Sequence, residues 1–482
     1  MAATFYWHDY ETTGVNPATA RPCQFAGQRT DENLQLIDEP LVLYCRPEDD
    51  ILPYPRACMV TGITPQHALE KGLPEPAFIR QIHTEMSAPE TCGVGYNSIR
   101  FDDEITRYAL YRNFYDPYQR EWQHGNSRWD IIDMLRLMRA LRPDGVEWPD
   151  HPSGAPSFRL EDITAANGIA HGQAHDALGD VLATINVAKR VKNLQPQLFD
   201  HIYSKRRKRA VAEFLDVTNP RPFLHVSGML ARENQYAAIM LPLAQHPSNP
   251  NAVICVDISA DPDELKLDAD ALKDRLFSAA DTLPRGTQRP ALKLVHVNKC
   301  PVVGTPKLVD SKVARRINID LDECHKNWQK LRSMDIREKL QRVYSRQVFA
   351  VKTEAEQRLY DGFIQDVDRP LMATVRAGTE ALLTQSSMTF SDPRYTDLLL
   401  SYRARYFPST LTDVEQNQWH EDCLWRLTDT QSGYCTLEQF NAELAEIEAE
   451  PTNDPFRPDV VKALREWAVR VANKFALTTD AT

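Results

Sequence analysis

The sequence has no hydrophobic run long enough to cross a membrane. A spanning helix needs roughly 18–20 consecutive apolar residues, and no stretch of the 482 residues comes near that length. The first residues, Met1-Ala2-Ala3-Thr4-Phe5, lack the basic region followed by an apolar stretch that marks a secretory signal. We therefore expect neither a membrane protein nor a secreted one.

Cysteines are few and scattered. There are nine, and no two of them form a CxxC pair. Such an odd, dispersed set gives no disulfide framework and no zinc pattern, and it fits a reducing compartment, so we expect a cytoplasmic location. No internal repeat and no low-complexity tract is visible. With 42% hydrophobic residues the chain can bury real cores, and its length predicts more than one domain.

The chain also lacks an overall excess of positive charge. Its net charge of −11 argues weakly against a nucleic-acid partner. The charge is uneven, however. Residues 1–200 have 18 Lys and Arg against 28 Asp and Glu, residues 201–350 have 25 against 17, and residues 351–482 have 13 against 22. A basic middle segment between acidic ones is explained either by a polyanionic partner or by pairing across domain interfaces, and charge alone does not decide between them.

Residues 1–197 alternate between strand and helix patterns. This alternation predicts an α/β domain with a central sheet. The predicted strands are 4–8 and 41–44, and the predicted helices are 78–86, 104–115, 131–141 and 177–191. The stretch from Asp144 to Ser157 is rich in Pro and Gly, so we expect an ordered loop or flap there.

The pattern is different in residues 201–300. Four β-branched or aromatic runs, broken by turn-rich pieces, predict a small antiparallel sheet or barrel: 223–229, 236–243, 252–258 and 292–303. Helical spacing returns from 310 to about 344. Residues 354–475 are predicted to be mostly helical, with loops at 407–412 and 451–459. The basic run Lys205–Arg209 marks the first boundary, and we interpret it as a solvated helix face.

Two acids follow the first predicted strand, in the run Asp9-Tyr10-Glu11-Thr12-Thr13-Gly14. Residues two apart on a strand project to the same side, so Asp9 and Glu11 point together. Adjacent carboxylates raise each other's pKa unless a cation lies between them. Oxygen ligands suit Mg²⁺ or Mn²⁺ better than zinc. The alternative is a solvated strand end that carries two acids.

A second acidic cluster, Asp102-Asp103-Glu104, opens a predicted helix. Acids at a helix N-terminus are favoured by the helix dipole. We assign Asp103 and Glu104 to that capping role and keep Asp102 as the candidate for chemistry.

The third cluster lies in Ala174-His175-Asp176-Ala177-Leu178-Gly179-Asp180. A His just before a helix and an Asp within it can present both side chains toward one point. Taken alone, His175 is an ordinary capping or surface residue, Asp176 is an N-cap, and Asp180 is a residue of a polar helix face.

Together, the three clusters resemble the DEDDh family of 3′–5′ exonucleases in their order and local contexts. Five further stretches resemble the bacterial exodeoxyribonuclease I family: 8–12, 111–118, 156–160, 294–301 and 402–408. Thr13 departs from the aromatic residue of some members. The resemblance implies a ribonuclease H-like α/β exonuclease domain at 1–197, an SH3-like β-barrel domain with a helical extension at 198–350, and an α-helical C-terminal domain at 351–482.

The resemblance also implies roles for individual residues. Asp9, Glu11 and Asp180 would hold the metal ion that activates water, with Asp9 bridging to a second ion and Asp102 acting through water. His175 would take the proton of the attacking water, and Glu11, Thr12 and Arg159 would contact the substrate. The implied cofactors are two Mg²⁺ ions, with Mn²⁺ as a substitute.

The implied function is processive 3′–5′ degradation of single-stranded DNA to 5′-mononucleotides in DNA repair and recombination. The implied protein is a monomer that binds the acidic tail of single-stranded DNA-binding protein, with Arg142 and the basic middle segment as candidate contacts. Arg403 and Arg405, with the aromatics around them, are candidates for strand binding. Two alternatives stay open: an exoribonuclease with the same five residues, and a noncatalytic single-strand-binding module.

Overall fold

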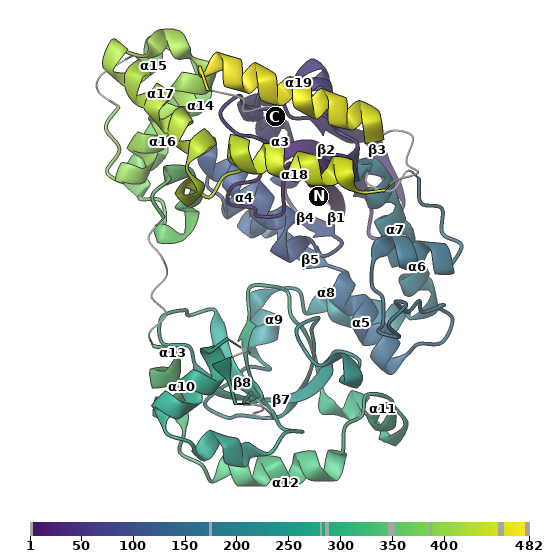
Figure 1. Cartoon of the computed structure of the whole chain (residues 1–482). Coiled ribbons are helices and arrows are strands. Elements are labelled where there is room, and N and C mark those ends of the chain that lie inside the picture. The colour runs from purple at the N-terminus through teal and green to yellow at the C-terminus, as the bar shows by residue number, and fades with distance from the viewer. Residues whose placement is uncertain are drawn as a thin grey trace. The chain divides into compact units, whose positions relative to one another are not determined.

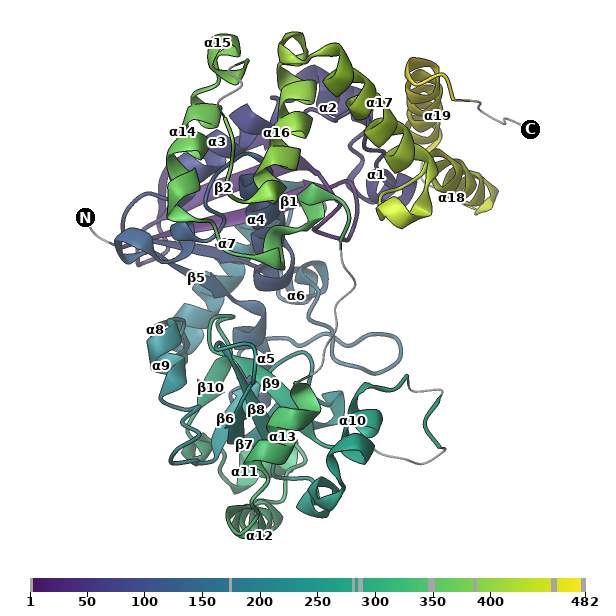
Figure 2. The ribbon, with the colours of Figure 1, turned by 90° about the vertical axis from the view of Figure 1, so that its left-hand side faces the viewer.

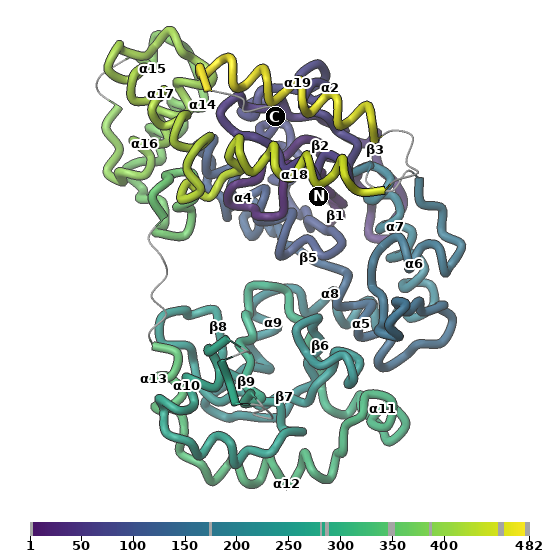
Figure 3. The backbone as a smooth tube through the Cα atoms, viewed as in Figure 1, coloured from purple at the N-terminus to yellow at the C-terminus, as the bar shows by residue number. Residues whose placement is uncertain are grey.

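The computed structural model describes residues 3–172, 176–279, 282–284, 289–345, 352–384, 388–451 and 457–477 (Figures 1 and 3). The chain forms two compact units. The first contains Met1–Ser127, His171–Leu182 and Val351–Thr482, and the second contains Arg128–Ala170 and Ala183–Ala350. None of the described helices is long and apolar enough to span a bilayer.

The sheet has the strand order β3-β2-β1-β4-β5, and its first four strands lie wholly in the first unit. They are β1 (Thr4–Thr12), β2 (Pro22–Thr30), β3 (Leu36–Tyr44) and β4 (Thr91–Gly95). β1 pairs with β2 in antiparallel and with β4 in parallel orientation, so it is an inner strand of a mixed sheet. The predicted strand 4–8 thus continues to Thr12, and both Asp9 and Glu11 lie on it.

Helices pack on this sheet through a shared core. The helices of the N-terminal part are α1 (Pro55–Thr61), α2 (Pro65–Lys71), α3 (Glu75–Met86), α4 (Asp102–Arg112) and the first turns of α7 (Ala177–Leu194). Phe25 of the sheet packs with Phe78 of α3 and Ile105 of α4 in one buried cluster. The apolar residues of α3 recur at helical spacing, so this helix buries one face, whereas α4 is buried on nearly all sides. The predictions for 78–86 and 104–115 are confirmed to within a few residues.

The C-terminal residues are mostly helical, as expected. Their helices are α14 (Arg369–Ala377), α15 (Glu380–Leu383), α16 (Pro393–Tyr406), α17 (Asp413–Thr428), α18 (Leu437–Ala449) and α19 (Arg457–Lys474). The predicted loop at 407–412 separates α16 from α17. The predicted loop at 451–459 falls partly outside the described residues, and α19 already begins at Arg457.

The C-terminal helices share cores with the N-terminal part. Phe114, just after α4, contacts Phe390, Tyr395 and Tyr402. Cys58 of α1 lies in a second buried cluster with Leu464 and Trp467 of α19. Figure 2 shows α1 beside α18 and α19. The two ends of the sequence therefore fold into one unit.

The second unit is built on an antiparallel sheet with the order β10-β6-β7-β8-β9 (Figure 2). The strands are β6 (Phe223–Val226), β7 (Ala237–Gln245), β8 (Ala252–Asp257), β9 (Leu292–His296) and β10 (Val302–Gly304). The prediction of one strand over 292–303 was wrong, because Cys300 adopts a positive φ of 46° in a turn between β9 and β10. These two strands lie at opposite edges of the sheet.

Helices account for much of the rest of the second unit. They are α5 (Ile132–Leu141), α6 (Leu160–Ala166), the remainder of α7, α8 (Pro196–Ser204), α9 (Lys208–Ala212), α10 (Ala269–Phe277), α11 (Ser311–Arg316), α12 (Leu321–Arg332) and α13 (Arg337–Tyr344). The last three confirm the helical extension predicted from 310 to 344, whereas α10 was not predicted. A short strand, β5 (Ser127–Asp130), precedes α5.

Two smaller predictions in the second unit had different outcomes. Residues 144–157 contain neither helix nor strand, apart from an isolated bridge between Asp150 and Pro156, which fits the expected loop. The run Lys205–Arg209 is not one helix face, because α8 ends at Ser204 and α9 begins at Lys208. Within it, Arg206 stacks 3.6 Å from the ring centre of Tyr203, and Lys208 donates to Asn251.

Candidate metal and nuclease site

Three acids from two elements converge in the first unit. Asp9 and Glu11 project from the end of β1, and Asp180 lies in the first turn of α7. Each offers a carboxylate oxygen, and these atoms all lie within 4.8 Å of one another. Glu11 is buried, while Asp9 and Asp180 are partly exposed. An all-oxygen donor set of this spacing fits a hard divalent cation such as Mg²⁺ or Mn²⁺.

A fourth acid is held against the same strand. Asp102 is the first residue of α4 and is buried. Its Oδ1 accepts a hydrogen bond of 3.1 Å from the backbone N–H of Tyr10, the residue between Asp9 and Glu11. The start of α4 therefore faces the acidic end of β1, as expected for Asp102.

The two acids that follow Asp102 in the sequence each form an ion pair with an arginine. Asp103 forms a buried ion pair with Arg120 at 2.6 Å, and Glu104 pairs with Arg107 at 2.8 Å. The residue before α4, Phe101, makes no side-chain cap. Both acids lie in the first turn of α4, where they suit the helix dipole as predicted, and both carboxylates in addition bind arginines.

The acids strongly perturb one another. Burial, with the nearby charges of Asp180 and Asp102, raises the pKa of Glu11 to about 8. Burial, followed by Asp102, Asp180 and Glu11, raises the pKa of Asp9 well above its ordinary value. Buried carboxylates in such a group cannot all ionise without a compensating positive charge. The electrostatics therefore point to a cation site, in agreement with the donor atoms.

A histidine that the sequence interpretation overlooked lies at this site. His171 Nε2 is 2.5 Å from Asp180 Oδ1, and both side chains are largely buried. The predicted proton acceptor, His175, lies outside the described residues. The pattern His171-Gly172-Gln173-Ala174-His175 contains two histidines, and this repetition was the sequence signal for the second one.

Gln24 is a second residue that sequence reasoning missed. It lies opposite Glu11 in the β1–β2 register. Its Nε2 donates to Asp176 Oδ1 at 3.1 Å, and its Oε1 accepts from the backbone N–H of Ala177 at 3.2 Å. This side chain therefore ties the start of α7, and with it Asp180, to the sheet. Nothing in the local sequence distinguished Gln24 from an ordinary polar residue.

Hydrogen bonds within the protein stabilise the turn after β1. Thr12 Oγ1 donates to the carbonyl of Gly14 at 2.8 Å, and the Thr13 N–H donates to the carbonyl of Arg21 at 2.9 Å. These bonds hold the turn in shape beside the acids. The substrate contact expected of Thr12 stays a prediction.

The remaining candidates lie elsewhere. Arg159, in the second unit, directly precedes α6, is exposed, and pairs with Glu161 at 3.4 Å; its substrate contact stays a prediction. Arg403 pairs with Glu415, and Arg405 binds Asp50 in a buried network. Tyr402 belongs to a hydrophobic core. Internal partners thus account for the Tyr402–Phe407 stretch that we had considered for strand binding.

Comparison with known proteins places the whole chain in one family. Exodeoxyribonuclease I of Escherichia coli K12 is 43% identical over 472 residues, which cover 97% of this chain and 98% of the relative. The Haemophilus influenzae exodeoxyribonuclease I is 46% identical over 420 residues, or 86% and 89% of the two chains. The chain belongs to the exonuclease I family. It is therefore a nuclease of the hydrolase class, an exodeoxyribonuclease.

Family models and solved structures agree with the expected order of domains. Matches describe an exonuclease at residues 6–188, an exonuclease I SH3-like domain at 206–346 and an exonuclease I C-terminal domain at 353–471. The moderately thermophilic exonuclease I from Methylocaldum szegediense superposes with a TM-score of 0.93, at 46% identity, over 98% of this chain and 100% of that one.

The E. coli exonuclease I in complex with a dA16 oligonucleotide also gives a TM-score of 0.93, at 43% identity, over 97% of this chain and 100% of that one. A further E. coli complex with single-stranded DNA is described as the zinc-ion-bound form. An exonuclease domain with a cluster of three acids implies dependence on a divalent metal. In this chain those acids are Asp9, Glu11 and Asp180.

Proposed function

We propose that this exodeoxyribonuclease degrades single-stranded DNA processively from the 3′ end to 5′-mononucleotides, in DNA repair and recombination. The observation that carries the proposal is the convergence of Asp9, Glu11 and Asp180 within 4.8 Å, with Asp102 bonded to the strand between the first two. A noncatalytic binding module has no need for four acids brought together at this cost in electrostatic repulsion.

We further propose a role for each residue. Asp9, Glu11 and Asp180 hold two Mg²⁺ ions, for which Mn²⁺ can substitute, and Asp102 acts through a water. Such ions would supply an activated water and stabilise charge on the leaving oxygen. His175 accepts the proton of the attacking water, since its ordinary pKa lies near neutral pH. Glu11 and Thr12 contact the terminal nucleotide, and the Arg159 guanidinium binds a phosphate.

The substrate and partner proposals rest on relatives. Their structures hold oligonucleotides of single-stranded DNA, and one is described as an SSB/exonuclease I complex with an inhibitor. We propose that this chain acts as a cytoplasmic monomer and binds the acidic tail of single-stranded DNA-binding protein. Arg142 and the basic residues of 201–350 are the candidate contacts. The domain bounds 1–197, 198–350 and 351–482 belong to the same proposal.

One assay tests the function. DNA and RNA oligonucleotides, labelled at either end, are incubated with the protein in Mg²⁺, in Mn²⁺ and in EDTA. We expect mononucleotides from the 3′ end of DNA in either metal, no cleavage in EDTA, and little cleavage of RNA. Comparable cleavage of RNA would favour the exoribonuclease, because the acids alone do not read the 2′-OH.

Two variants connect the activity to the site. Asp9→Asn should abolish cleavage in Mg²⁺ and leave binding of a long single strand nearly unchanged. The matched control is Asp38→Asn, which makes the same chemical change at an exposed position on β3 of the same sheet and should retain full activity. Near-normal turnover by Asp9→Asn would refute the metal assignment.

A further inference from the structure

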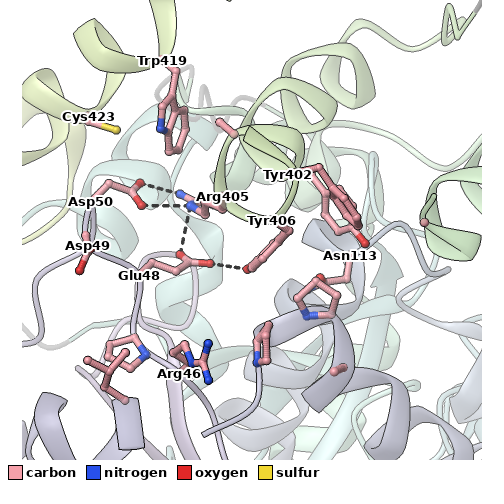
Figure 4. Close-up of a pocket in the computed structure, with 18 of the residues that line it drawn as sticks. Arg46, Glu48, Asp49, Asp50, Asn113, Tyr402, Arg405, Tyr406, Trp419 and Cys423 are labelled. Carbon is pink, nitrogen blue, oxygen red and sulfur yellow. Dashed lines mark hydrogen bonds and ion pairs between the residues drawn. The ribbon is translucent and has the colours of Figure 1, made fainter. Parts of the chain in front are cut away.

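A pocket of about 820 Å³ lies in the first unit and includes none of the four site acids. Its walls come from the loop that contains Arg46 and Asp50, from α3, and from α14, α16, α17 and α19 of the C-terminal part (Figure 4). This volume is within the usual range for pockets that bind small molecules. The charges and hydrogen-bonding groups on its walls indicate which kind of molecule it would hold.

At one end of the pocket, basic and acidic side chains satisfy one another. Asp49 accepts from Lys474 at 2.6 Å and from Arg470 at 3.4 Å. Arg405 pairs with Asp50 at 2.7 Å and lies 3.4 Å from Glu48, whose other oxygen accepts from the Tyr406 hydroxyl (Figure 4). These acidic and basic groups are therefore already paired with one another.

The other end has positive charge that no carboxylate balances within the described part of the chain. Arg376 of α14 donates to the carbonyl of Phe114 and lies over the ring of Tyr115, 4.7 Å from its centre. Arg80, on α3, is exposed and lies within electrostatic range of the same tyrosine. Burial lowers the pKa of Arg376. An anion placed between these two arginines would compensate the charge.

A buried acceptor also points to a ligand. Asn113 lines the pocket and is only 2% exposed. Its Nδ2 donates to Glu75 Oε2 at 3.0 Å and to the carbonyl of Ala109 at 2.8 Å, and because both partners are acceptors they fix the orientation of the amide. Asn113 Oδ1 has no hydrogen-bond partner among the described residues. Buried acceptors of this kind normally receive a donor.

Aromatic side chains complete this end of the pocket. The rings of Tyr115 and Tyr402 lie near both Arg80 and Arg376, and Phe407 lines the pocket beside them. Aromatic walls suit a planar ring, the arginines suit a phosphate, and Asn113 Oδ1 suits an amine or hydroxyl donor.

We propose that this pocket binds a free nucleoside 5′-monophosphate. The phosphate lies between Arg80 and Arg376, the base lies against the tyrosine rings, and an exocyclic amine or sugar hydroxyl donates to Asn113 Oδ1. The ligand has two sources: deoxynucleotides, which are the products of the proposed reaction, and ribonucleotides of the cellular pool. The inference rests on these residues and is independent of the acid site.

Calorimetric titration of the full-length protein in EDTA tests this proposal, because EDTA removes divalent ions from the acid site. The probes are dAMP, AMP, inorganic phosphate and deoxyadenosine. We expect a single site for a nucleotide, with phosphate and nucleoside each at least tenfold weaker. Tighter binding of dAMP than of AMP would identify the reaction product as the ligand, and the reverse would identify the ribonucleotide pool.

Variants place the ligand in the pocket. Arg80→Gln and Arg376→Gln should each weaken nucleotide binding at least tenfold, the loss expected for a charge-assisted contact. Arg470→Gln, at the paired end of the same pocket, should leave the affinity within twofold. Because Arg80 is exposed, its variant tests the site even if Arg376→Gln folds poorly.

Three results would overturn the proposal: no heat of binding at millimolar nucleotide, unchanged affinity in Arg80→Gln, or phosphate alone binding as tightly as the nucleotide. Since nuclease activity is not the readout, these results are independent of the function proposed above. Asp9→Asn should bind the nucleotide normally.

Discussion

At the scale of single residues, the site is defined by carboxylates forced together. Asp9 and Glu11 share one side of β1, and α7 brings Asp180 to within 4.8 Å of them. Asp102 is aimed at the same strand through its bond to the Tyr10 N–H. Each of these acids has ordinary chemistry in isolation. Burial and mutual repulsion raise the pKa of Asp9 and Glu11, and this makes the site responsive to both metal and pH.

The first prediction concerns pH and metal removal. The folded, metal-free protein holds a proton on Glu11 up to about pH 8, whereas the ordinary pKa is 4.5. Since the folded state binds more protons than the unfolded state in that window, its stability falls as pH rises from about 4.5 to about 8. Melting temperatures measured in EDTA should therefore decrease across this range, and added Mg²⁺ should restore most stability at its upper end.

Glu11→Gln tests the cause of that dependence. The variant should flatten the dependence of the EDTA melting temperature on pH, while the exposed control Asp38→Asn should keep the wild-type slope. An unchanged slope in Glu11→Gln would show that other groups, and not this carboxylate, produce the effect.

The second prediction concerns the proton acceptor. His175→Ala should lower kcat by roughly 10²–10⁴, the usual range for a lost general base, and should flatten the acidic limb of the pH–rate profile. His171→Ala is the comparison, because His171 lies 2.5 Å from Asp180. This substitution should lower kcat less than tenfold. A larger loss of kcat in His171→Ala than in His175→Ala would identify His171 as the proton acceptor.

At the scale of elements, the site depends on how β2 anchors α7. Gln24 bonds Asp176 and the Ala177 N–H, so one side chain sets where α7 begins relative to the sheet. The position of Asp180, one turn further on, follows from that anchor. The mixed sheet and the start of α4 provide the other fixed points.

The third prediction tests this anchor. Gln24→Leu should destabilise the protein by about 1–3 kcal/mol, because buried polar groups lose their partners. It should also lower kcat roughly tenfold to hundredfold by displacing Asp180. Gln28→Leu is the matched control: Gln28 is an equally buried glutamine of β2, and its Nε2 donates to backbone carbonyls of β2 and β3. Equal losses of kcat in the two variants would contradict the anchoring role.

At the scale of the whole molecule, a buried ion network joins the two ends of the sequence in the first unit. Glu356 binds both Arg21 and Arg405, Arg21 binds Glu48 at 2.9 Å, and Arg405 binds Asp50 at 2.7 Å. Burial alone would raise the pKa of Glu356, but Arg405 and Arg21 hold it well below its ordinary value. Its stabilising contribution is therefore lost only as the pH falls.

The fourth prediction removes one charge from this network. Glu356→Gln leaves two buried arginines short of a counter-charge and should cost about 3–5 kcal/mol in urea unfolding. The control Glu448→Gln breaks a partly exposed pair with Arg465 and should cost less than about 1 kcal/mol. Similar unfolding midpoints for the two variants would mean that the network contributes little.

The fifth prediction concerns the uneven charge of the chain. If residues 201–350 hold a DNA strand, each phosphate contact contributes about −0.7 to the slope of log K against log salt. Lys299 lies exposed in the turn between β9 and β10. Lys299→Ala should therefore make the slope of log K against log salt less negative by about 0.7. Lys326→Ala is the control, because it makes the same change at an exposed position on α12. A slope unchanged in Lys299→Ala would remove this residue from the DNA contacts.

Local patterns predicted those elements whose side chains follow one clear period. β1 and the helices α3, α5 and α7 fall in this class. β2 was missed because Gln24, Gln28 and Arg29 interrupt its apolar pattern, although long-range partners satisfy all three. The two edge strands β9 and β10 were taken for one strand because the turn at Cys300 has no Gly or Asn at its positive-φ position.

The sequence by itself determined the chemistry of the site, because the choice of carboxylates and their order along the chain specify an oxygen-ligand metal site. Only the tertiary structure decided that Asp102 faces the site while its neighbour Asp103 binds Arg120. It also decided that His171 contacts Asp180 and that Gln24 bonds Asp176, the residue before α7. It also decided that residues 351–482 share cores with the N-terminal part and form a pocket with it. Such contacts join residues far apart in the chain, and they depend on packing that no local periodicity encodes.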